Sequence, residues 1–230
     1  MSQVAAHQSR MEEQQYAEFG QSHFGSVSAS KLARIRADAG ESVLDVGCGP
    51  GLYLEALGSL GFKVTGVDSR SVFVEQAAKA GARVERVDLE REALSRFTEG
   101  AFDTVLMLDI LEHVSNDIEL LEDALRVCRK NVIITVPARM SETFDKSQLV
   151  FGSCVDPTHL RYYSHSDLHR LFDEATIKNY KIDVGLRFDP VLYNIFPKYL
   201  RYPLAFLNRA LLKVSDRNLF ATVWYAVAWK

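Results

Sequence analysis

The segment that constrains the fold most is 43–51, where a short apolar run leads directly into three closely spaced glycines. Val43, Leu44 and Val46 predict a short buried strand. The glycines predict a tight turn, because glycine adopts backbone angles and allows close approaches that a side chain would forbid. Residues 52–60, with leucines on one face, predict the helix that follows. A strand, a turn and a helix start in this order place backbone N–H groups beside a ligand.

The spacing of these glycines separates two classes of ligand. A dinucleotide site requires Gly-x-Gly-x-x-Gly/Ala, in which the third small residue packs the helix against the strand. Here the glycines are Gly47, Gly49 and Gly51, and Leu52 stands where the small residue should be. The dinucleotide pattern therefore fails at its third term. What remains is Asp-x-Gly-x-Gly-x-Gly, which begins at Asp45 and has an acid directly ahead of the turn.

Strand and helix patterns alternate along the rest of the chain. We expect strands at 62–68, 83–89, 102–109, 131–137, 177–188 and 220–229, and helices at 31–39, 71–80, 117–129 and 167–174. Gly40 is expected to cap the C-terminus of the first helix. The alternation predicts an α/β fold with a parallel sheet and right-handed crossovers, and ligands at the carboxyl ends of the strands. A length of 230 residues predicts a single domain, 1–230.

Asp68 ends the second expected strand, about 20 residues beyond Gly47, a spacing at which an acid reaches ribose hydroxyls in nucleotide-binding α/β folds. A carboxylate accepts two hydrogen bonds, so a diol is a natural partner. The alternative for Asp68 is the N-cap of the next helix, a role for which Ser69 and Ser71 compete.

The segment 45–51 closely resembles motif I of the class I S-adenosylmethionine (SAM)-dependent methyltransferases. The resemblance implies that the turn wraps the methionyl and ribose parts of SAM, and that Asp45 anchors the cationic end. Asp68 matches the acid of the family's motif II. The resemblance also implies a Rossmann-like α/β fold: a seven-stranded, mostly parallel sheet with helices on both faces. The last strand of that sheet is antiparallel and lies between its neighbours.

Further cofactor contacts follow from the same resemblance. Asp88 ends the third strand and matches the acid that bonds the adenine amino group, whereas Leu89 matches the apolar residue that flanks the ring. A solvated loop acid is the alternative for Asp88. Leu108 matches a residue that touches SAM. The expected cofactor-binding residues are Asp45, Gly47, Cys48, Gly49, Gly51, Asp68, Ser69, Asp88, Leu89 and Leu108.

Two histidines are the candidate catalytic residues. The segment 108–114 resembles the Leu-Glu-His motif of small-molecule methyltransferases, including the quinone-biosynthesis type, and His113 either lines the pocket or caps a helix. The segment 156–164 resembles one seen in methyltransferases of small polar or sugar substrates. His159 within it is a candidate base or substrate ligand, because imidazole titrates near neutral pH. The alternative is that His159 bonds backbone groups and pins the loop.

Composition and missing motifs exclude several classes. A formal net charge of -3 argues against a general phosphate-backbone binder. The Asp/Asn-Pro-Pro-aromatic tetrad and the Pro-Cys nucleophile of base methyltransferases are absent, so no nucleic-acid partner is expected. The three cysteines form no Cys-x-x-Cys, and we expect neither a disulfide framework nor a metal site. No apolar run reaches the roughly 18 residues of a membrane span, and residues 1–15 lack a signal-peptide core. A cytoplasmic location is therefore expected.

The resemblance covers roughly residues 30–185 and the last strand, and two segments lie wholly or largely outside it. Residues 1–39 predict a helical segment that docks on the core or closes as a lid. Residues 189–219 form an insert between the last two strands, rich in aromatic and basic residues. We expect the insert to be a helical cap on the sheet edge or a homodimer contact. The alternative is a surface that recognises a lipid-linked substrate through peripheral membrane contact.

The resemblance implies methyl transfer from SAM to a small-molecule substrate. A hydroxyl of a sugar, glycan or metabolite is the first expectation for the acceptor, and a quinone or lipid-linked acceptor is the alternative. A nicotinamide oxidoreductase is a rival class that Leu52 opposes. A non-catalytic SAM-binding protein is the other rival, opposed by the retained acids and glycines of the pocket.

Overall fold

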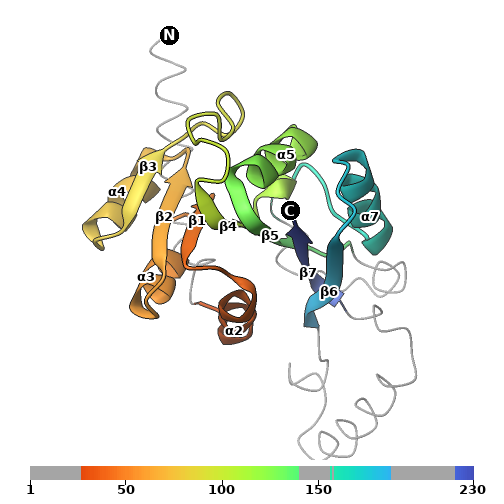
Figure 1. Cartoon of the computed structure of the whole chain (residues 1–230), viewed down its shortest axis with the longest axis horizontal. Helices are drawn as coiled ribbons and strands as arrows, with labels where there is room; N and C mark the ends of the chain where they lie inside the picture. The colour runs from red at the N-terminus through yellow and green to blue at the C-terminus, as the bar shows by residue number, and fades with distance from the viewer. Residues whose placement is uncertain (1–26, 140–155, 157, 188–220) are drawn as a thin grey trace, which may run out of the picture.

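The computed structural model describes residues 27–139, 156, 158–187 and 221–230. Its helices are α2 (Ala29–Asp38), α3 (Leu52–Ser59), α4 (Ser71–Lys79), α5 (Asp117–Val127) and α7 (His165–Glu174), with a 3-10 turn η1 (Leu111–His113). Its strands are β1 (Ser42–Val46), β2 (Lys63–Asp68), β3 (Arg83–Arg86), β4 (Phe102–Leu108), β5 (Cys128–Pro137), β6 (Tyr180–Arg187) and β7 (Ala221–Trp229). Figure 1 shows these elements around one central sheet.

The strands form one seven-stranded sheet in the order β3-β2-β1-β4-β5-β7-β6. Strand β1 pairs in parallel with both β2 and β4, and β4 pairs in parallel with β5. Strand β7 is antiparallel to β5 and to β6, and it lies between them. The predicted Rossmann-like α/β fold, including the position of the last strand, is therefore confirmed. The order of strands switches at β1: β2 and β3 are added on one side of it, and β4 and β5 on the other. Open α/β sheets bind ligands at such a switch point, which here lies between β1 and β4.

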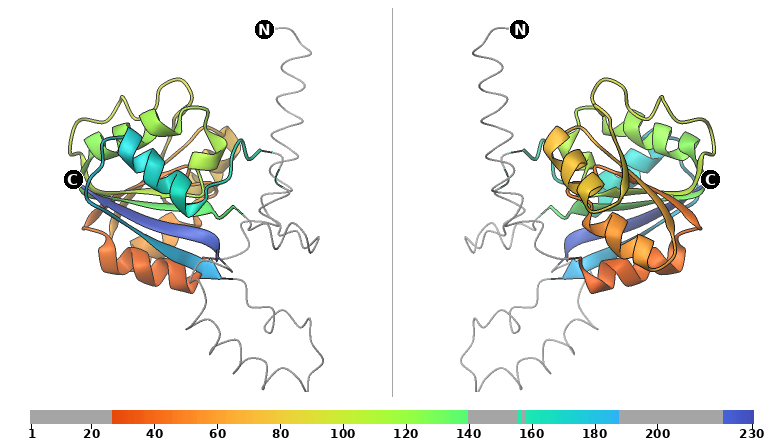
Figure 2. Two further views of the ribbon diagram at one scale, coloured as in Figure 1. Left: turned by 90° about the vertical axis from the view of Figure 1, so that its right-hand side faces the viewer. Right: turned by 90° about the vertical axis from the view of Figure 1, so that its left-hand side faces the viewer.

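The sheet is covered on both faces because its central strands are apolar on both sides. Consecutive residues of β1 point to different faces: Val43 packs in the core that contains α2 and α3, and Leu44 packs in the core beneath α5 and α7. Figure 2 shows α2 and α3 on one side of the sheet and α5 and α7 on the other. Helix α4 packs against β2 and β3.

Several expected boundaries differ from the structure by two or three residues; β6, for example, begins at Tyr180 and not at the expected 177. Strand β3 ends at Arg86, ahead of the expected 89, and β5 begins at Cys128, ahead of the expected 131. Gly40 was expected to cap the C-terminus of this helix, but the C-cap residue of α2 is Ala39, which is extended, and this expectation was wrong. Gly40 instead permits a close approach, since a Cβ there would lie 2.4 Å from the Cβ of Asp103.

The two peripheral segments are described only in part. Helix α2 docks on the core through the fully buried Ile35, whereas residues 1–26 and the insert 189–219 lie outside the described residues. The lid and membrane-contact predictions therefore stay predictions. Within the described ranges, no helix has the length and apolar character needed to cross a membrane.

The close approach at Gly40 predicts a matched pair of stability changes. Gly40→Ala should lower the free energy of unfolding by about 1–3 kcal/mol, because the new methyl group overlaps Asp103. Gly58→Ala is the control: it lies in α3 with nothing within 4 Å of its added Cβ. That variant should gain up to about 1 kcal/mol from helix propensity. Urea unfolding measures both, and equal effects in the two variants would contradict the packing argument.

Candidate active site

A cavity of about 520 Å³ opens where the carboxyl ends of the central strands meet η1 and the segment before α7. Nine of the ten expected cofactor-binding residues line it, and Gly51 does not. Both candidate catalytic histidines line it too. The residues that line the cavity include Lys31, Asp45, Gly47, Cys48, Gly49, Tyr53, Asp68, Ser69, Arg70, Asp88, Leu89, Glu90, Leu108, Asp109, Ile110, Glu112, His113, Asp156 and His159.

The glycine turn is fixed by backbone hydrogen bonds to β2. The N–H groups of Gly47 and Cys48 donate to the carbonyl of Val67, at 2.8 and 3.0 Å. Gly47 has φ +74°, and a Cβ there would lie 2.6 Å from Ile110. The turn therefore requires glycine both for its conformation and for the close approach of η1.

Gly51 acts behind the cavity rather than in its wall. It has φ +89° at the N-cap of α3, and an added Cβ would lie 2.9 Å from the Cβ of Ala77 in α4. Its small size lets α3 and α4 pack closely. The structure therefore gives Gly51 a packing role and shows no cavity-facing surface for it.

Asp68 joins the turn to the end of β2. One carboxylate oxygen accepts a hydrogen bond from the N–H of Gly49 and the other from the N–H of Arg70, both at 2.9 Å. Helix α4 has Arg70 at its N-cap position with no side-chain cap, so neither Ser69 nor Ser71 caps it. Burial raises the pKa of Asp68, and its backbone hydrogen bonds oppose that shift. Each oxygen retains a lone pair for a hydroxyl of a ligand.

Asp45 lies on β1 and is 2% exposed. Burial, followed by the charge of Asp68, raises the pKa of Asp45 to about 7, and Lys31 opposes the shift. A cation bound beside Asp45 would stabilise its charged form. The site therefore favours a ligand that carries positive charge at this end of the cavity.

Lys31 was missed by the sequence analysis. Its ammonium group reaches from α2 to Asp109 at the end of β4, at 2.6 Å, and to the hydroxyl of Thr135 at 3.2 Å. Asp109 has φ +55°, a conformation that is uncommon for residues other than glycine. A helix pattern places Lys31 only on a polar face, and nothing local indicates that this face covers a cavity.

The adenine-binding expectation concerns the outer part of the cavity. Leu89 lines it directly after β3, and the Asp88 side chain is 43% exposed. Asp88 accepts a hydrogen bond from the N–H of Glu90 at 3.1 Å and lies 3.5 Å from Arg91. Asp88 is therefore a cavity-lining acid that is also partly solvated, and both alternatives from the sequence describe part of its environment.

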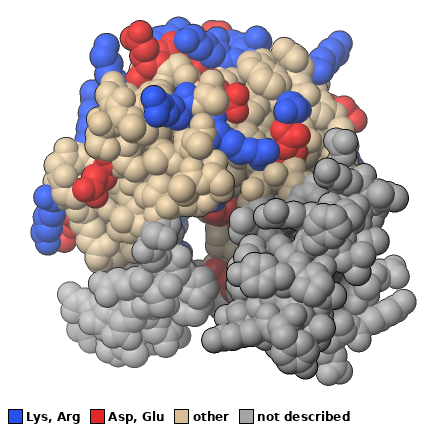
Figure 3. All heavy atoms as spheres, turned by 90° about the horizontal axis from the view of Figure 1, so that it is seen from below, with Lys and Arg blue, Asp and Glu red and all other residues tan. Residues whose placement is uncertain are grey.

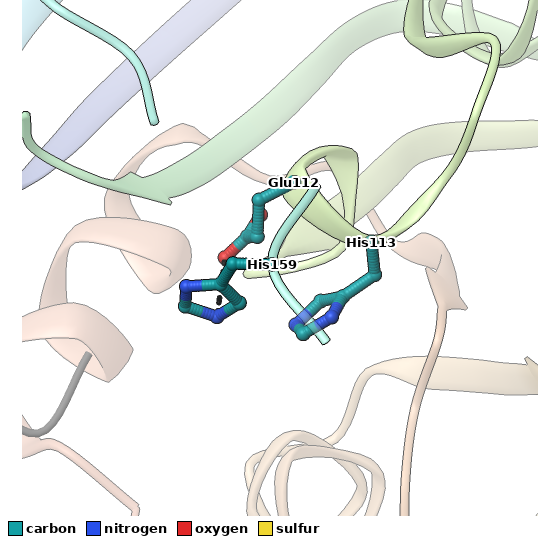
Figure 4. Close-up of side chains that lie close together, drawn as sticks. All are labelled: Glu112, His113 and His159. Atoms are coloured by element: carbon teal, nitrogen blue, oxygen red, sulfur yellow. Dashed lines mark ion pairs between the residues drawn. The ribbon is translucent and has the colours of Figure 1, made fainter. Parts of the chain in front are cut away.

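The two candidate catalytic histidines lie together (Figure 4). The rings of His113, in η1, and His159 have centroids 4.7 Å apart, and His159 Nε2 lies 4.0 Å from Glu112 Oε1. His113 does not cap α5, because Asn116 holds that position. His159 Nδ1 is buried without a hydrogen-bond partner among the described residues, so this atom does not pin the loop. The ligand atoms of Glu112, His113 and His159 all lie within 4.8 Å of one another, close enough for a metal ion.

Acidic groups dominate the wall of the cavity. Seven carboxylates line it, against the permanent cations Lys31 and Arg70. The face seen in Figure 3 shows basic and acidic side chains interspersed among uncharged ones, without a continuous basic surface on its coloured part. SAM carries a sulfonium and an ammonium group, and the acidic wall and glycine turn fit such a cationic nucleoside.

A family model described as "Methyltransferase domain" matches residues 16–181. The chain belongs to the class I SAM-dependent methyltransferases. This family membership, the order of the sheet and the position of the turn agree with one another. The resemblance inferred from 45–51 is thereby confirmed.

Curated relatives of this methyltransferase include two named "Ubiquinone biosynthesis O-methyltransferase". The one from Idiomarina loihiensis is 31% identical over 164 residues, which cover 66% of this chain and 67% of the relative. The one from Maricaulis maris is 34% identical over 111 residues, 46% of this chain and 41% of the relative. The matched stretches thus span about two fifths to two thirds of these relatives.

Solved structures show the same fold at low identity. A SAM-dependent methyltransferase from Archaeoglobus fulgidus superposes with a TM-score of 0.66 at 19% identity, covering 94% of this chain and 100% of the other. The plantazolicin methyltransferase BamL, solved with S-adenosylhomocysteine (SAH), has a TM-score of 0.58 at 15% identity, with coverage of 87% and 81%. At identities this low, the similarity to these two structures shows the fold alone.

The raised pKa of Asp45 predicts a pH-dependent effect of Asp45→Asn. A carboxyl whose folded pKa is about 7 and whose ordinary value is 3.8 stabilises the fold at low pH, and this contribution is lost as the pH rises through 7. The variant should therefore gain stability relative to the parent between pH 5 and 8.5, by roughly 2–3 kcal/mol. Chemical unfolding at both pH values measures the difference. An equal difference in stability between the parent and Asp45→Asn at the two pH values would contradict this prediction.

Proposed function

We propose that this methyltransferase transfers the methyl group of SAM to a hydroxyl oxygen of a small quinone-type or phenolic acceptor. The observation that carries the proposal is a single cavity that holds the turn and strand-end acids beside the cluster of Glu112, His113 and His159. The printed names of the relatives favour the quinone alternative. Nothing in the comparisons supports the sugar or glycan acceptor that the sequence analysis placed first.

The residues of one end of the cavity fit the parts of SAM. Asp45 suits the ammonium group, and Lys31 offers a counter-charge for the carboxylate of the methionyl part. Asp68 has lone pairs for the ribose hydroxyls, and Leu89 and Leu108 offer apolar surface for the nucleoside. SAM supplies an already activated methyl group, so the protein needs no covalent nucleophile. Its task is to hold the acceptor oxygen, the methyl carbon and the sulfur in line, an effect worth up to roughly 7–11 kcal/mol in model reactions.

The other end of the cavity suits the acceptor. His113, His159 and Glu112 lie beyond Leu108, on the segments that follow β4 and precede α7. A hydroxyl bound there would find several hydrogen-bonding groups within one small volume. We therefore keep His159 and His113 as candidate catalytic residues. A role for 189–219 in holding a lipid tail, or in forming a homodimer, stays a prediction.

The cofactor assignment predicts selective binding of SAH. Calorimetric titration should show SAH bound and NAD not bound, because the turn lacks the third small residue of a dinucleotide site. Asp68→Ala should weaken SAH binding by 100-fold or more, since hydrogen bonds to a charged group contribute about 1.5–3 kcal/mol each. Asp173→Ala, which removes a carboxylate of α7 that does not line the cavity, is the control and should change the affinity little. Unchanged affinity in a folded Asp68→Ala protein would show that the ribose assignment is wrong.

The acceptor assignment predicts a separate effect of His159→Ala. Turnover of a phenolic or quinol acceptor should fall by roughly 10²-fold or more, whereas SAH affinity should stay within a few-fold. His169→Ala is the control, because His169, on α7, contacts Tyr180 of β6 and does not line the cavity. Labelled SAM and a panel of phenols, quinols and sugars measure turnover. Full activity of His159→Ala, or transfer to sugars alone, would contradict the assignment.

A further inference from the structure

We propose that strand β6 pairs with β6 of a second copy of this chain, so that two chains form a homodimer with one continuous sheet. The sheet ends in β3 on one side and in β6 on the other, as Figure 1 shows. Among the described strands, β6 pairs with β7 alone and leaves its other edge open. An open edge of this kind can take up a strand of another chain. No residue of β6 lines the cavity, so the dimer and the proposed function can be tested separately.

The hydrogen bonds between β6 and β7 show which backbone groups face the open edge. Trp229 donates its N–H to the carbonyl of Asn179 at 2.9 Å, and these two residues are opposite each other when the register of the strands is extended by one position. Antiparallel strands exchange hydrogen bonds at every second opposite pair. Lys181 and Asp183 therefore bond β7, and the N–H and C=O groups of the residues that alternate with them point outward.

The outward groups belong to Tyr180, Ile182 and Val184. Among the described residues these groups have one partner, the guanidinium of Arg34, which donates to the carbonyl of Val184 at 3.2 Å. That carbonyl has a second lone pair for another donor. A second β6, antiparallel and centred on Ile182, brings outward groups to outward groups: Ile182 lies opposite its own copy, and Tyr180 lies opposite Val184 of the partner subunit.

The charged face of β6 is complementary to itself in the same register. Lys181 lies opposite Asp183 of the partner subunit, and Asp183 lies opposite the partner's Lys181. Within one chain these two side chains pair at 2.7 Å and are 65% and 37% exposed. The dimer exchanges the ion pair along each strand for pairs across the strands, and opposite charges in directly opposite positions stabilise a sheet.

The other face of the contact is apolar. Tyr180, Ile182 and Val184 pack in part against the core beneath α7, and the ring of Tyr180 lies 4.6 Å from that of Phe172, measured between centroids. In the dimer Ile182 would meet its own copy, and Tyr180 would meet the partner's Val184. Pairs of aromatic and β-branched residues stabilise neighbouring strands. A single register therefore suits the backbone, the charged face and the apolar face together.

The two ends of the sheet differ in their protection against such pairing. Strand β3 has four residues, of which Arg83, Glu85 and Arg86 are charged. A short and highly charged strand is a common protection of an open edge. Strand β6 has eight residues and carries one charge of each sign over 180–184. A lysine can also protect an edge, so the alternative is a monomer in which Lys181 has that role.

Sedimentation of the full-length protein over a range of concentrations measures the dimer. A contact of five residues in each strand buries a small area, so we expect a mass that rises with concentration toward twice that of the chain. Lys181→Glu and Asp183→Lys should each weaken the dimer by roughly 10-fold or more, because each places like charges opposite one another. Arg83→Glu, the same change of charge at the edge of β3, is the control and should form the dimer as the parent does.

A mixture of the two variants gives the sharpest test. Lys181→Glu makes the charged face of β6 acidic, and Asp183→Lys makes it basic, so each variant repels its own copy and attracts the other. The mixture should therefore form a heterodimer at concentrations at which each variant alone is a monomer. The ion pair within one strand cannot produce this result, because both variants lack it in the mixture too.

Three outcomes would overturn the proposal. A parent that stays monomeric at every concentration would leave β6 an edge protected by Lys181. A dimer that both variants form as well as the parent would place the contact on another surface, such as 189–219. Folded variants that stay monomeric when mixed would contradict the register. Circular dichroism shows whether each variant is folded, and titration with SAH tests the proposed function independently of the dimer.

Hydrogen exchange of the parent provides a second test if either variant does not fold. The N–H of Ile182 points outward, so its exchange should slow as the concentration of protein rises and the dimer forms. The N–H of Lys181 is already bonded to β7 and should exchange at a rate that depends little on concentration. An Ile182 amide whose exchange is independent of concentration would contradict the pairing of the two strands.

Discussion

The hydrogen bonds that tie the glycine turn to the end of β2 determine where the other groups of the cavity lie. The N–H groups of Gly47 and Cys48 share the carbonyl of Val67, and that of Gly49 reaches the carboxylate of Asp68. Parallel pairing in register, with Val46 opposite Val67, brings these groups to the same level of the sheet. The register of β1 and β2 therefore places the glycine turn and Asp68 together at the cofactor end of the cavity.

Stability and function oppose each other around this cavity. Asp45 and Glu112 are almost completely buried, and Asp109 has a left-handed conformation that most residues avoid. Each of these features raises the free energy of the fold. The apolar strands β1, β4 and β5, packed on both faces, offset that cost. The buried carboxyl groups and the left-handed aspartate thus gather where a ligand is expected to bind. Unfavourable features of this kind are typical of binding sites in otherwise stable folds.

The parts that could be predicted from the sequence are those set by short-range patterns. The strand, turn and helix of 43–60 and the alternation of strands and helices depend on neighbouring residues, and the structure has them. Lys31 in the cavity and Glu112 against His159 depend on contacts between distant segments, so no local pattern indicates them. Gly40 illustrates the same limit: a glycine after a helix predicts a C-cap, but here the neighbouring strand requires the small residue.

The two ends of the cavity come from different parts of the fold. The cofactor end is built from the turn and from the ends of β1 and β2, whereas the acceptor end combines η1 with the segment before α7. That segment is held firmly: Leu160 donates its N–H to the carbonyl of Glu112 at 2.8 Å, and Arg161 and Tyr163 both bond Asp117 at 2.6 Å. The hydrogen bonds of the residues next to it therefore fix the backbone of His159, and this backbone determines where its side chain lies. Substitutions in this segment can change the acceptor while the register of β1 and β2 preserves the cofactor end.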